Sequence, residues 1–355
     1  MIHNFNAGPS FLPQSVLQQA SQAIINFNNS GLSILEIGHR TPLFESVMEE
    51  ARSLVKELMN LDDRHEVLFL HGGATTQFMQ VPMNLLNENE TAAYADTGVW
   101  STKAIKEAKL YGKVEVVCSS KDKNYTYIPK DFAVSNNATY LHITTNNTIY
   151  GTQWQKIPEV SMPLIADMSS DILSRQLDFN SFDLIFAGAQ KNMGAAGTTL
   201  VVVNKEILGK LNRPVPPIMD YQAHIQAKSM LNTPPVFAVY ASMITLRWLK
   251  ENGGVAAMEK LNAEKSKLLY EAIDNSKLFK GTVAVEDRSK MNVCFVMENA
   301  EKEKQFLEFA KQNDIYGIKG HRSVGGFRAS LYNALPLSSV EYLVEKMEEF
   351  EHSVS

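Results

Sequence analysis

The stretch FDLIFAGAQKNMGAAGTTLVVV, residues 182–203, places one lysine between two segments that both read as buried β-strands. Residues 184–187 and 198–203 are short apolar runs that contain β-branched side chains. The linker between them is almost wholly Gly, Ala, Asn and Gln, which leaves room for another group to approach Lys191. Lys191 therefore has two interpretations. Its aliphatic chain packs on apolar surface while its ammonium lies in water, or it is a desolvated amine of lowered pKa that attacks a carbonyl.

The length and composition bound the class of protein. A chain of 355 residues exceeds the usual size of a single core, so we expect one large domain and a smaller one. A net charge of −5 and a charged fraction of 21% are ordinary for a globular protein and indicate neither a nucleic-acid nor a membrane partner. Cys118 and Cys294 lie far apart in apolar runs, which is typical of reduced thiols. Because the N-terminal residues 1–14 show no secretion signal, we expect a cytoplasmic protein.

Alternating strand-like and helical segments predict an α/β fold with a mostly parallel sheet flanked by helices. After an expected helix at 14–27 and an amphipathic one that follows it, seven strand-like segments appear at 66–70, 91–96, 114–118, 138–144, 163–167, 183–188 and 199–203. Beyond Pro235 the pattern changes to long helices at 236–251 and 255–275, a strand pair near 282–297 and two more amphipathic helices. We therefore expect a large domain over 15–260, and a smaller α+β domain formed by 1–14 and 261–355.

A carboxylate follows one of the predicted strands. In MPLIADMSSDI the strand ends at Asp167, 24 residues before Lys191, and a βαβ-like repeat sets both residues at the same edge of the sheet. Standing alone, Asp167 is equally well a turn or cap residue. Beside a Schiff-base lysine, it gains the task of keeping a pyridine nitrogen protonated.

Two further strand ends carry candidate cofactor contacts. In EVLFLHGGATTQF a Gly-Gly turn leads into a helix, whose free amides at Ala74 and Thr75 suit a phosphate. Such turns are common in α/β folds, and this one lacks the lysine and spacing of a P-loop. In DTGVWSTKA, Trp100 opens another helix and is either a core residue or a flat face for an aromatic cofactor.

Two separate His-Arg pairs suggest anion recognition. KGHRSVGGFRASLYNA holds His321, Arg322 and Arg328, and EIGHRTP holds His39 and Arg40 far upstream. Arginines that bind carboxylate or phosphate would suit a substrate with two anionic ends, although a basic surface patch also fits. The eight histidines are scattered, and HExxH, CxxC and GxSxG motifs are missing, so the sequence points to neither a zinc site nor a serine hydrolase.

Eight motifs in order resemble the phosphoserine aminotransferases, a family of the fold type I pyridoxal-phosphate enzymes. They are FNAGPSFLP, GHRTPLFESV, HGGATTQF, NNTIYGTQ, ADMSSDILSR, GAQKNMG, NTPPVFAVY and GHRSVGGFRASLYNA, and the likeness runs nearly from end to end. The resemblance implies pyridoxal 5'-phosphate as cofactor, a fold type I α/β architecture with a smaller α+β C-terminal domain, and a homodimer whose active sites are built from both chains.

The resemblance also assigns roles to residues that hold the cofactor. By position, Lys191 resembles the lysine that forms the Schiff base and later shuttles the proton at the substrate Cα. Asp167 would hold the pyridine nitrogen, Trp100 would stack on the ring, and Thr148 would bond the phenolic oxygen. The residues implied for the cofactor phosphate are Ala74, Thr75 and Gln190, with Asn232 and Thr233 of the partner subunit.

For the substrate, the resemblance implies that Arg328 clamps the α-carboxylate with help from the backbone of Ala7. The residues implied for the distal anionic group are His321 and Arg322, with His39 and Arg40 of the partner subunit. One departure is visible, because Ala74 and Thr75 stand where relatives often carry Gly-Arg, so any side-chain role of that arginine is missing here.

The implied reaction moves the amino group of L-glutamate to 3-phosphohydroxypyruvate, giving O-phospho-L-serine and 2-oxoglutarate in serine biosynthesis. Activity on 4-phosphohydroxythreonine, in pyridoxine biosynthesis, is left open. The alternatives are another fold type I enzyme, such as an alanine-glyoxylate aminotransferase or a cysteine desulfurase, and a binding protein that has lost catalysis. A desulfurase would need a mobile cysteine near the site, and a binding protein would not need both Lys191 and Asp167.

Overall fold

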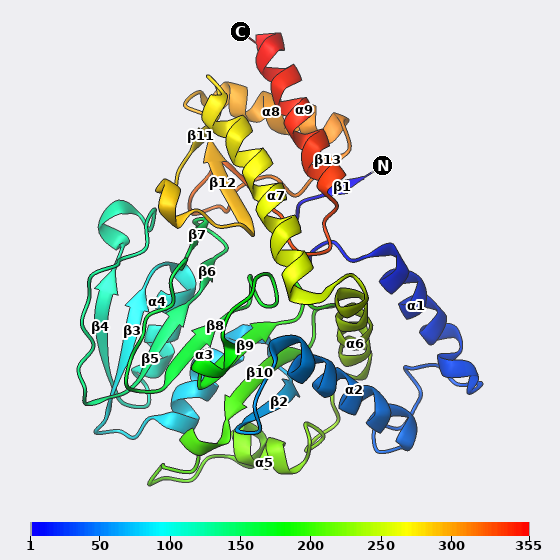
Figure 1. The fold of residues 1–355 in the computed structure, drawn as a ribbon, viewed down its shortest axis with the longest axis vertical. Coiled ribbons are helices and arrows are strands. Elements are labelled where there is room, and N and C mark those ends of the chain that lie inside the picture. The colour runs from blue at the N-terminus through cyan, green and yellow to red at the C-terminus, as the bar shows by residue number, and fades with distance from the viewer. Residues whose placement is uncertain (1, 355) are drawn as a thin grey trace.

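The computed structural model describes residues 2–354 and centres on a seven-stranded sheet with the order β2-β10-β9-β8-β5-β3-β4 (Figure 1). The strand β10 is antiparallel to both of its neighbours, and the other strands pair in parallel. The predicted α/β class and all seven predicted strands are thus confirmed. The bounds are β2 His65–Leu70, β3 Thr91–Asp96, β4 Lys113–Ser119, β5 Ala138–Thr144, β8 Leu164–Asp167, β9 Leu184–Gly188 and β10 Thr199–Asn204.

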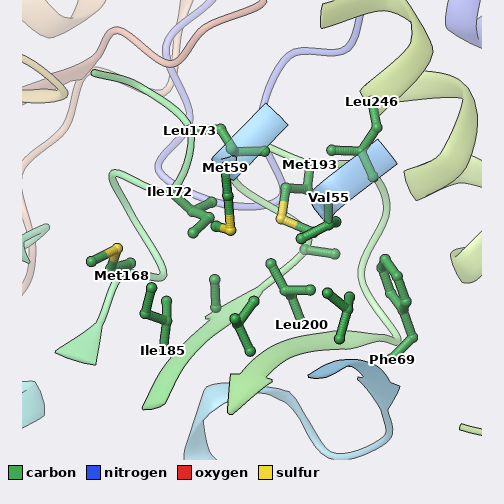
Figure 2. Close-up of a cluster of buried hydrophobic side chains, with 14 of the residues drawn as sticks. Val55, Met59, Phe69, Met168, Ile172, Leu173, Ile185, Met193, Leu200 and Leu246 are labelled. Carbon is green, nitrogen blue, oxygen red and sulfur yellow. The ribbon is translucent and has the colours of Figure 1, made fainter. Parts of the chain in front are cut away.

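Helices cover both faces of this sheet, because its strands are apolar on both sides. Phe69 points to a core that it shares with two helices on one face, whereas its neighbour Leu68 belongs to the core on the other face. Figure 2 shows Phe69, Ile185 and Leu200 of the strands beneath side chains of two helices, among them Val55, Met59 and Leu246. The first face carries α2 (Pro42–Met59) and α6 (Val236–Glu251), and the second carries α3 (Gly73–Leu85), α4 (Val99–Ala108) and α5 (Tyr221–Gln226).

The C-terminal elements form a second apolar core, in the upper part of Figure 1. The N-terminal strand β1 joins them by pairing in parallel with β13, which brings Phe5 into this core. The elements are β1 His3–Asn4, α7 Gly254–Asn275, β11 Lys280–Gly281, β12 Asn292–Val296, α8 Ala300–Gln312, β13 Ile315–Tyr316, β14 Phe327–Ser330 and α9 Leu337–Val354. The remaining regular segments that bear on the site are α1 Gln14–Ile25, β6 Asn146–Asn147 and β7 Thr152–Gln153.

The helix α7 runs through both cores. Its first half places Val255 and Met258 in the core of the large sheet, and its second half places Leu269 and Ile273 in the C-terminal core. The division near residue 260 falls inside this helix and stays a prediction. Met1 and Ser355, which the expected domain limits include, lie outside the described residues.

The sequence predicts a helix at 14–27, and the predicted C-terminal end is wrong. The helix α1 stops at Ile25, because Asn26 leaves the helical conformation and its side-chain oxygen accepts a hydrogen bond from the Gly31 amide at 2.9 Å. Asparagine side chains compete with helical backbone bonds in this way.

Over residues 2–354, no helix is both long enough and apolar enough to cross a membrane.

A fully buried lysine ties α7 to the chain that leaves β14. Lys265 is 0% exposed, and its Nζ donates to the carbonyls of Leu331 and Tyr332, both at 2.8 Å, and of Leu335 at 3.2 Å. Burial lowers the pKa of Lys265 to about 7. The three carbonyl bonds favour the protonated amine, and they use all three of its donors.

We predict that Lys265→Met lowers the free energy of unfolding by about 2–4 kcal/mol, because three buried carbonyls lose their donor. Chemical denaturation of the variant beside the parent protein measures this loss. Lys267→Met, on the same helix but with a side chain 74% exposed, is the matched control and should stay within about 0.5 kcal/mol. Equal stability of both variants would show that the buried amine does not hold this segment.

Candidate active site

Lys191 lies three residues beyond the end of β9, at the edge of the sheet where the parallel strands end. Its Nζ donates a hydrogen bond to the Thr148 hydroxyl at 2.8 Å. The N-terminal segment covers its backbone, because the Ser10 amide donates to the Gln190 carbonyl at 3.0 Å and the Ser10 hydroxyl donates to the Lys191 carbonyl. The segment approaches so closely that a Cβ on Gly8 would meet Lys191 Cγ at 3.3 Å.

The residue that follows this lysine by two positions anchors the loop. Met193 is 0% exposed and packs in the core beside Met59 and Leu173, as Figure 2 shows. The side chain of Asn192 adds polar fixation, since it donates to the Ile172 carbonyl at 2.9 Å and accepts from the Asn333 amide at 3.0 Å. The position of Lys191 is therefore held from both ends of its loop.

Asp167 stands beside Lys191 as predicted. It is the last residue of β8, it is 3% exposed, and its Oδ1 accepts the Ser169 amide at 2.9 Å. Burial raises the pKa of Asp167, while the hydrogen bonds from Ser169 and the charge of Lys191 oppose that rise. Because β8 and β9 are adjacent and parallel, both residues reach the same sheet edge.

The electrostatic surroundings favour a reactive amine at Lys191. Burial lowers its pKa to about 8, Asp167 acts in the opposite direction, and Arg328 adds to the lowering. A lysine of this pKa is partly neutral near neutral pH, which is the form that attacks a carbonyl. The second of the two interpretations of the lysine is thus the one that the geometry supports.

Sequence reasoning missed a buried polar network under Asp167. Asp171 is 2% exposed and accepts the Thr145 hydroxyl at 2.5 Å, Gln153 at 3.2 Å and Arg175 at 3.3 Å. The Thr145 amide donates to the Asp167 carbonyl at 3.0 Å. The network thereby links the end of β8 to the hairpin of β6 and β7 that carries Thr148. The run of polar residues in ADMSSDILSR was the available signal, but it does not reveal that they are buried.

Trp100 opens α4 and lies beside the lysine. The Lys191 Nζ is 5.9 Å from the centroid of the Trp100 ring, and Phe78 of α3 lies 6.5 Å from it, ring centre to ring centre. Its indole N–H is buried and has no hydrogen-bond partner among the residues that the structure describes. The ring is therefore placed to flank a flat group at the lysine. Its indole N–H remains available to donate one hydrogen bond.

The N-terminus of α3 offers unoccupied amide donors. Gly72 has a φ of 91°, a conformation that suits glycine, and no side chain caps the helix. A Cβ added at Gly73 would meet nothing within 4 Å, so the space in front of this first turn is open. The amides of Ala74 and Thr75 are thus available to an anion.

The other residues expected at the phosphate lie near this turn to different degrees. The Gln190 side chain folds back over Gly188, where an added Cβ would meet its Oε1 at 2.7 Å. Burial and His224 lower the pKa of His71, while a hydrogen bond with the Thr233 backbone raises it, so Thr233 and its neighbour Asn232 lie beside the Gly-Gly turn of their own chain. Their expected reach into a second site stays a prediction.

Arg328 of β14 lies against the same lysine. One of its terminal nitrogens donates to the Thr148 carbonyl at 3.2 Å, and its Nε is buried with no partner in the described part of the chain. Ala7 is held nearby, since its carbonyl accepts the Tyr332 hydroxyl at 2.9 Å. Both residues therefore border the space in front of Lys191, as expected of a carboxylate clamp.

The two His-Arg pairs differ in their position relative to the site around Lys191. Burial lowers the pKa of His321, and the charges of Arg328, Arg322 and Lys103 lower it further, so His321 lies within electrostatic reach of Arg328. Arg322 is exposed. In contrast, His39 and Arg40 form no hydrogen bond or ion pair with the groups around Lys191 over residues 2–354. The His39 Nε2 is buried without a partner there, and Arg40 is exposed.

No group of three or more His, Cys, Asp or Glu side chains is arranged to hold a metal ion within residues 2–354. Cys294 is buried and Cys118 is half-buried in an edge strand, and both are free thiols. Burial raises the pKa of each thiol to about 12, which makes neither a ready nucleophile.

Comparisons with known proteins agree with this arrangement. The class-V aminotransferase model matches residues 2–343. The phosphoserine aminotransferase of Flavobacterium johnsoniae is 58% identical, with 99% of each chain covered. Among solved structures, the phosphoserine aminotransferase from Bacillus circulans subsp. alkalophilus superposes with a TM-score of 0.97 at 43% identity, covering 100% of this chain and 99% of that one.

A further solved structure is described with its cofactor. The PLP-bound phosphoserine aminotransferase from Trichomonas vaginalis superposes with a TM-score of 0.92 at 37% identity, covering 98% of this chain and 100% of that one. Coverage at these levels extends over both cores and over the residues that border Lys191. The chain therefore belongs to the class-V aminotransferases and, within them, to the phosphoserine aminotransferase family.

Proposed function

We propose that this enzyme transfers the amino group of L-glutamate to 3-phosphohydroxypyruvate, giving O-phospho-L-serine and 2-oxoglutarate, with pyridoxal 5'-phosphate as cofactor. The observation that carries the proposal is the juxtaposition of the partly neutralised amine of Lys191 with Thr148 at 2.8 Å and with the buried Asp167. Such a step belongs to serine biosynthesis. A cytoplasmic setting, in keeping with two free cysteines, is part of the proposal.

The residues present fit that cofactor. An uncapped helix N-terminus with open space at Gly73, an indole with an unused N–H and a buried carboxylate surround one lysine of lowered pKa. When bound, pyridoxal phosphate acts as an electron sink that makes the Cα–H bond of an attached amino acid acidic. Lys191 would hold the cofactor covalently, Asp167 its ring nitrogen, Trp100 its ring face and Thr148 its phenolic oxygen. The phosphate would lie on Ala74, Thr75 and Gln190, with Asn232 and Thr233 of the partner subunit.

The protein supplies proton transfer and orientation. Lys191 would be the general base that takes the proton from the substrate Cα and later returns a proton to the bound group. Because Asp167 is buried, its charge is poorly screened and acts strongly on a ring nitrogen next to it. Arg328 would fix the α-carboxylate through guanidinium donors that have no partner among residues 2–354. The backbone at Ala7, which Tyr332 holds in place, would assist it.

The distal anion would be bound by groups from two subunits. His321 lies within electrostatic reach of Arg328 and would, with Arg322, serve the site of its own chain. His39 and Arg40 form no hydrogen bond or ion pair with the groups around Lys191 over residues 2–354. Exposed apolar side chains precede His39 in the sequence, and a second copy of the chain would bury them in a homodimer. They are Leu17, Ile24, Ile25, Leu32 and Leu35, between 41% and 72% exposed.

The alternatives are less well supported. An alanine-glyoxylate aminotransferase would not need a second set of cationic groups for a distal anion, and the relatives of high identity are phosphoserine aminotransferases. A cysteine desulfurase needs a reactive cysteine, which the raised thiol pKa values disfavour.

The direct experiment is a steady-state assay of the purified, cofactor-loaded enzyme. Glutamate with 3-phosphohydroxypyruvate should give a kcat/KM at least about a hundredfold above that of alanine with glyoxylate, because the cationic groups would be left unpaired by the smaller acid. Lys191→Ala should abolish turnover of both pairs. A preference for alanine and glyoxylate would refute the proposed substrates and favour the first alternative.

The lowered pKa of Lys191 predicts the pH dependence of cofactor attachment to cofactor-free protein. Only the neutral amine attacks the aldehyde, so below a pKa of about 8 the protonated amine is inactive and above it the rate levels off. The attachment rate, followed by visible absorbance, should therefore rise from about pH 7 to about pH 9. A rate that rises only near pH 10, like that of an ordinary lysine in a peptide, would contradict the burial of this amine.

The shared site predicts strong effects of the two His-Arg pairs on substrate affinity. Arg40→Ala or Arg322→Ala should raise KM for 3-phosphohydroxypyruvate by the equivalent of roughly 2–5 kcal/mol, because a buried charge pair with the substrate is lost. Arg64→Ala is the matched control, since Arg64 pairs with Asp62 at 2.7 Å on the surface and should leave KM unchanged. Unchanged KM in both test variants would remove the pairs from the site.

Mixing two variants, assayed at a substrate concentration far below the KM of Arg40→Ala, separates a partner's contribution from one within the chain. Lys191→Ala and Arg40→Ala subunits, unfolded and refolded together, form mixed dimers in which one site has both residues intact only if Arg40 acts across the interface. The mixture should then recover about a quarter of the parent activity, because half of the dimers are mixed and each has one complete site. No recovery would place Arg40 in its own chain's site or outside any site.

A further inference from the structure

Lys103, one turn into α4, lies at the mouth of the site and was not singled out by the sequence. Its Nζ is 4.6 Å from the centroid of the Trp100 ring, and Lys191 Nζ is 5.9 Å from the same centroid. Lys103 is exposed, and its ammonium lies against the indole. One ring thus carries both the reactive amine and a second, solvent-facing cation.

The indole of Trp100 is the contact that Lys103 makes on its own helix. Among the described residues, no carboxylate oxygen forms an ion pair with Lys103.

The helix itself carries Glu107, four residues after Lys103 and not paired with it in the described part of the chain. The carboxylate that precedes the helix is already used. Asp96, at the end of β3, accepts Ser101 at 3.0 Å and Thr102 at 2.9 Å with one oxygen. Its other oxygen accepts Tyr125 at 3.2 Å and Ser119 at 3.3 Å. These bonds fix the start of α4, and with it Trp100 and Lys103, and leave Asp96 occupied by hydroxyl donors.

The charge of Lys103 also acts on His321, in the loop before β14. The pKa of His321 is lowered by burial, then by Arg328, by Arg322 and by Lys103. Helix α4 and the loop before β14, far apart in sequence, therefore bring like charges to one opening. Such an arrangement costs free energy in the empty site, and an anion with more than one charge would relieve it.

We propose that Lys103 is a specificity-determining residue, which uses its ammonium to recognise the distal phosphate dianion of the substrate in preference to a carboxylate. The inference rests on the proposed function and deepens it. A phosphate of charge close to −2 gains about twice as much from one added cation as a carboxylate of charge −1 at the same distance. Lys103 would therefore separate the phosphorylated keto acid from glutamate, which must use the same site in the other half of the reaction.

The test compares three variants of the cofactor-loaded enzyme. Lys103→Gln should raise KM for 3-phosphohydroxypyruvate about tenfold and KM for glutamate less than about threefold, with a smaller change in kcat than in the first KM. Lys103→Arg should restore most of the affinity, because it keeps the charge. Lys106→Gln, one turn further along the same helix and exposed, is the matched control and should leave both constants unchanged.

A second readout does not depend on turnover. In Lys103→Gln without substrate, the pKa of His321, followed by NMR, should rise because one of the charges that lower it is gone. Adding inorganic phosphate should raise the His321 pKa in the parent enzyme more than in the variant.

The outcomes separate the two claims. If the parent enzyme does not use 3-phosphohydroxypyruvate, the proposed function fails. If the parent enzyme does use it, but Lys103→Gln and Lys106→Gln have equal KM values for it, the proposed role of Lys103 is overturned. Equal losses of affinity for glutamate and for the phosphorylated substrate would also overturn it, because they would indicate a general effect on the site.

Discussion

The structure depends on one constraint, which is the burial of an amine next to a carboxylate at the end of two adjacent parallel strands. Desolvation disfavours the charge on Lys191 and on Asp167, and their mutual attraction offsets only part of that cost. A pair held in this way is reactive at both ends. The amine is available as a nucleophile and base, and the carboxylate remains a strong partner for a protonated ring nitrogen.

The surrounding fold offsets the cost of burying these two groups with packing and polar contacts that reach across the molecule. Met193 anchors the lysine loop in the core, and Asn192 connects it to Asn333 of the C-terminal part. The N-terminal segment closes over the lysine through Ser10. Below Asp167, the buried pair of Asp171 and Arg175 holds the neighbouring hairpin. Three regions distant in sequence thus fix a single side chain, which explains why both cores are needed for one site.

Much of this arrangement could be predicted from local sequence. The seven strands were recognisable because each is a short apolar run bounded by turns, and helix α6 was predicted with its observed ends. Lys191, Asp167, Trp100 and the Gly-Gly turn all stand at strand ends, and parallel strands bring such ends together. Their meeting therefore follows from topology alone.

Other features could not be read from the sequence, because they depend on what packs against each residue. Lys265 and Arg52 occupy helix positions where a solvent-exposed charge is normal, yet both are buried with carbonyl or carboxylate partners. Lys103 looks like any surface lysine until the loop before β14 is placed opposite it. The end of α1 was missed because a side-chain bond of Asn26 to a residue five positions away stops the helix.

The central claim is that one buried amine is the attachment point of the cofactor. Borohydride reduction of the enzyme loaded with pyridoxal phosphate, followed by peptide mass spectrometry, tests it most directly. The account predicts a single reduced adduct, on Lys191, with Lys103 and Lys265 unmodified. An adduct on another lysine, or a protein that takes up no pyridoxal phosphate at all, would contradict it.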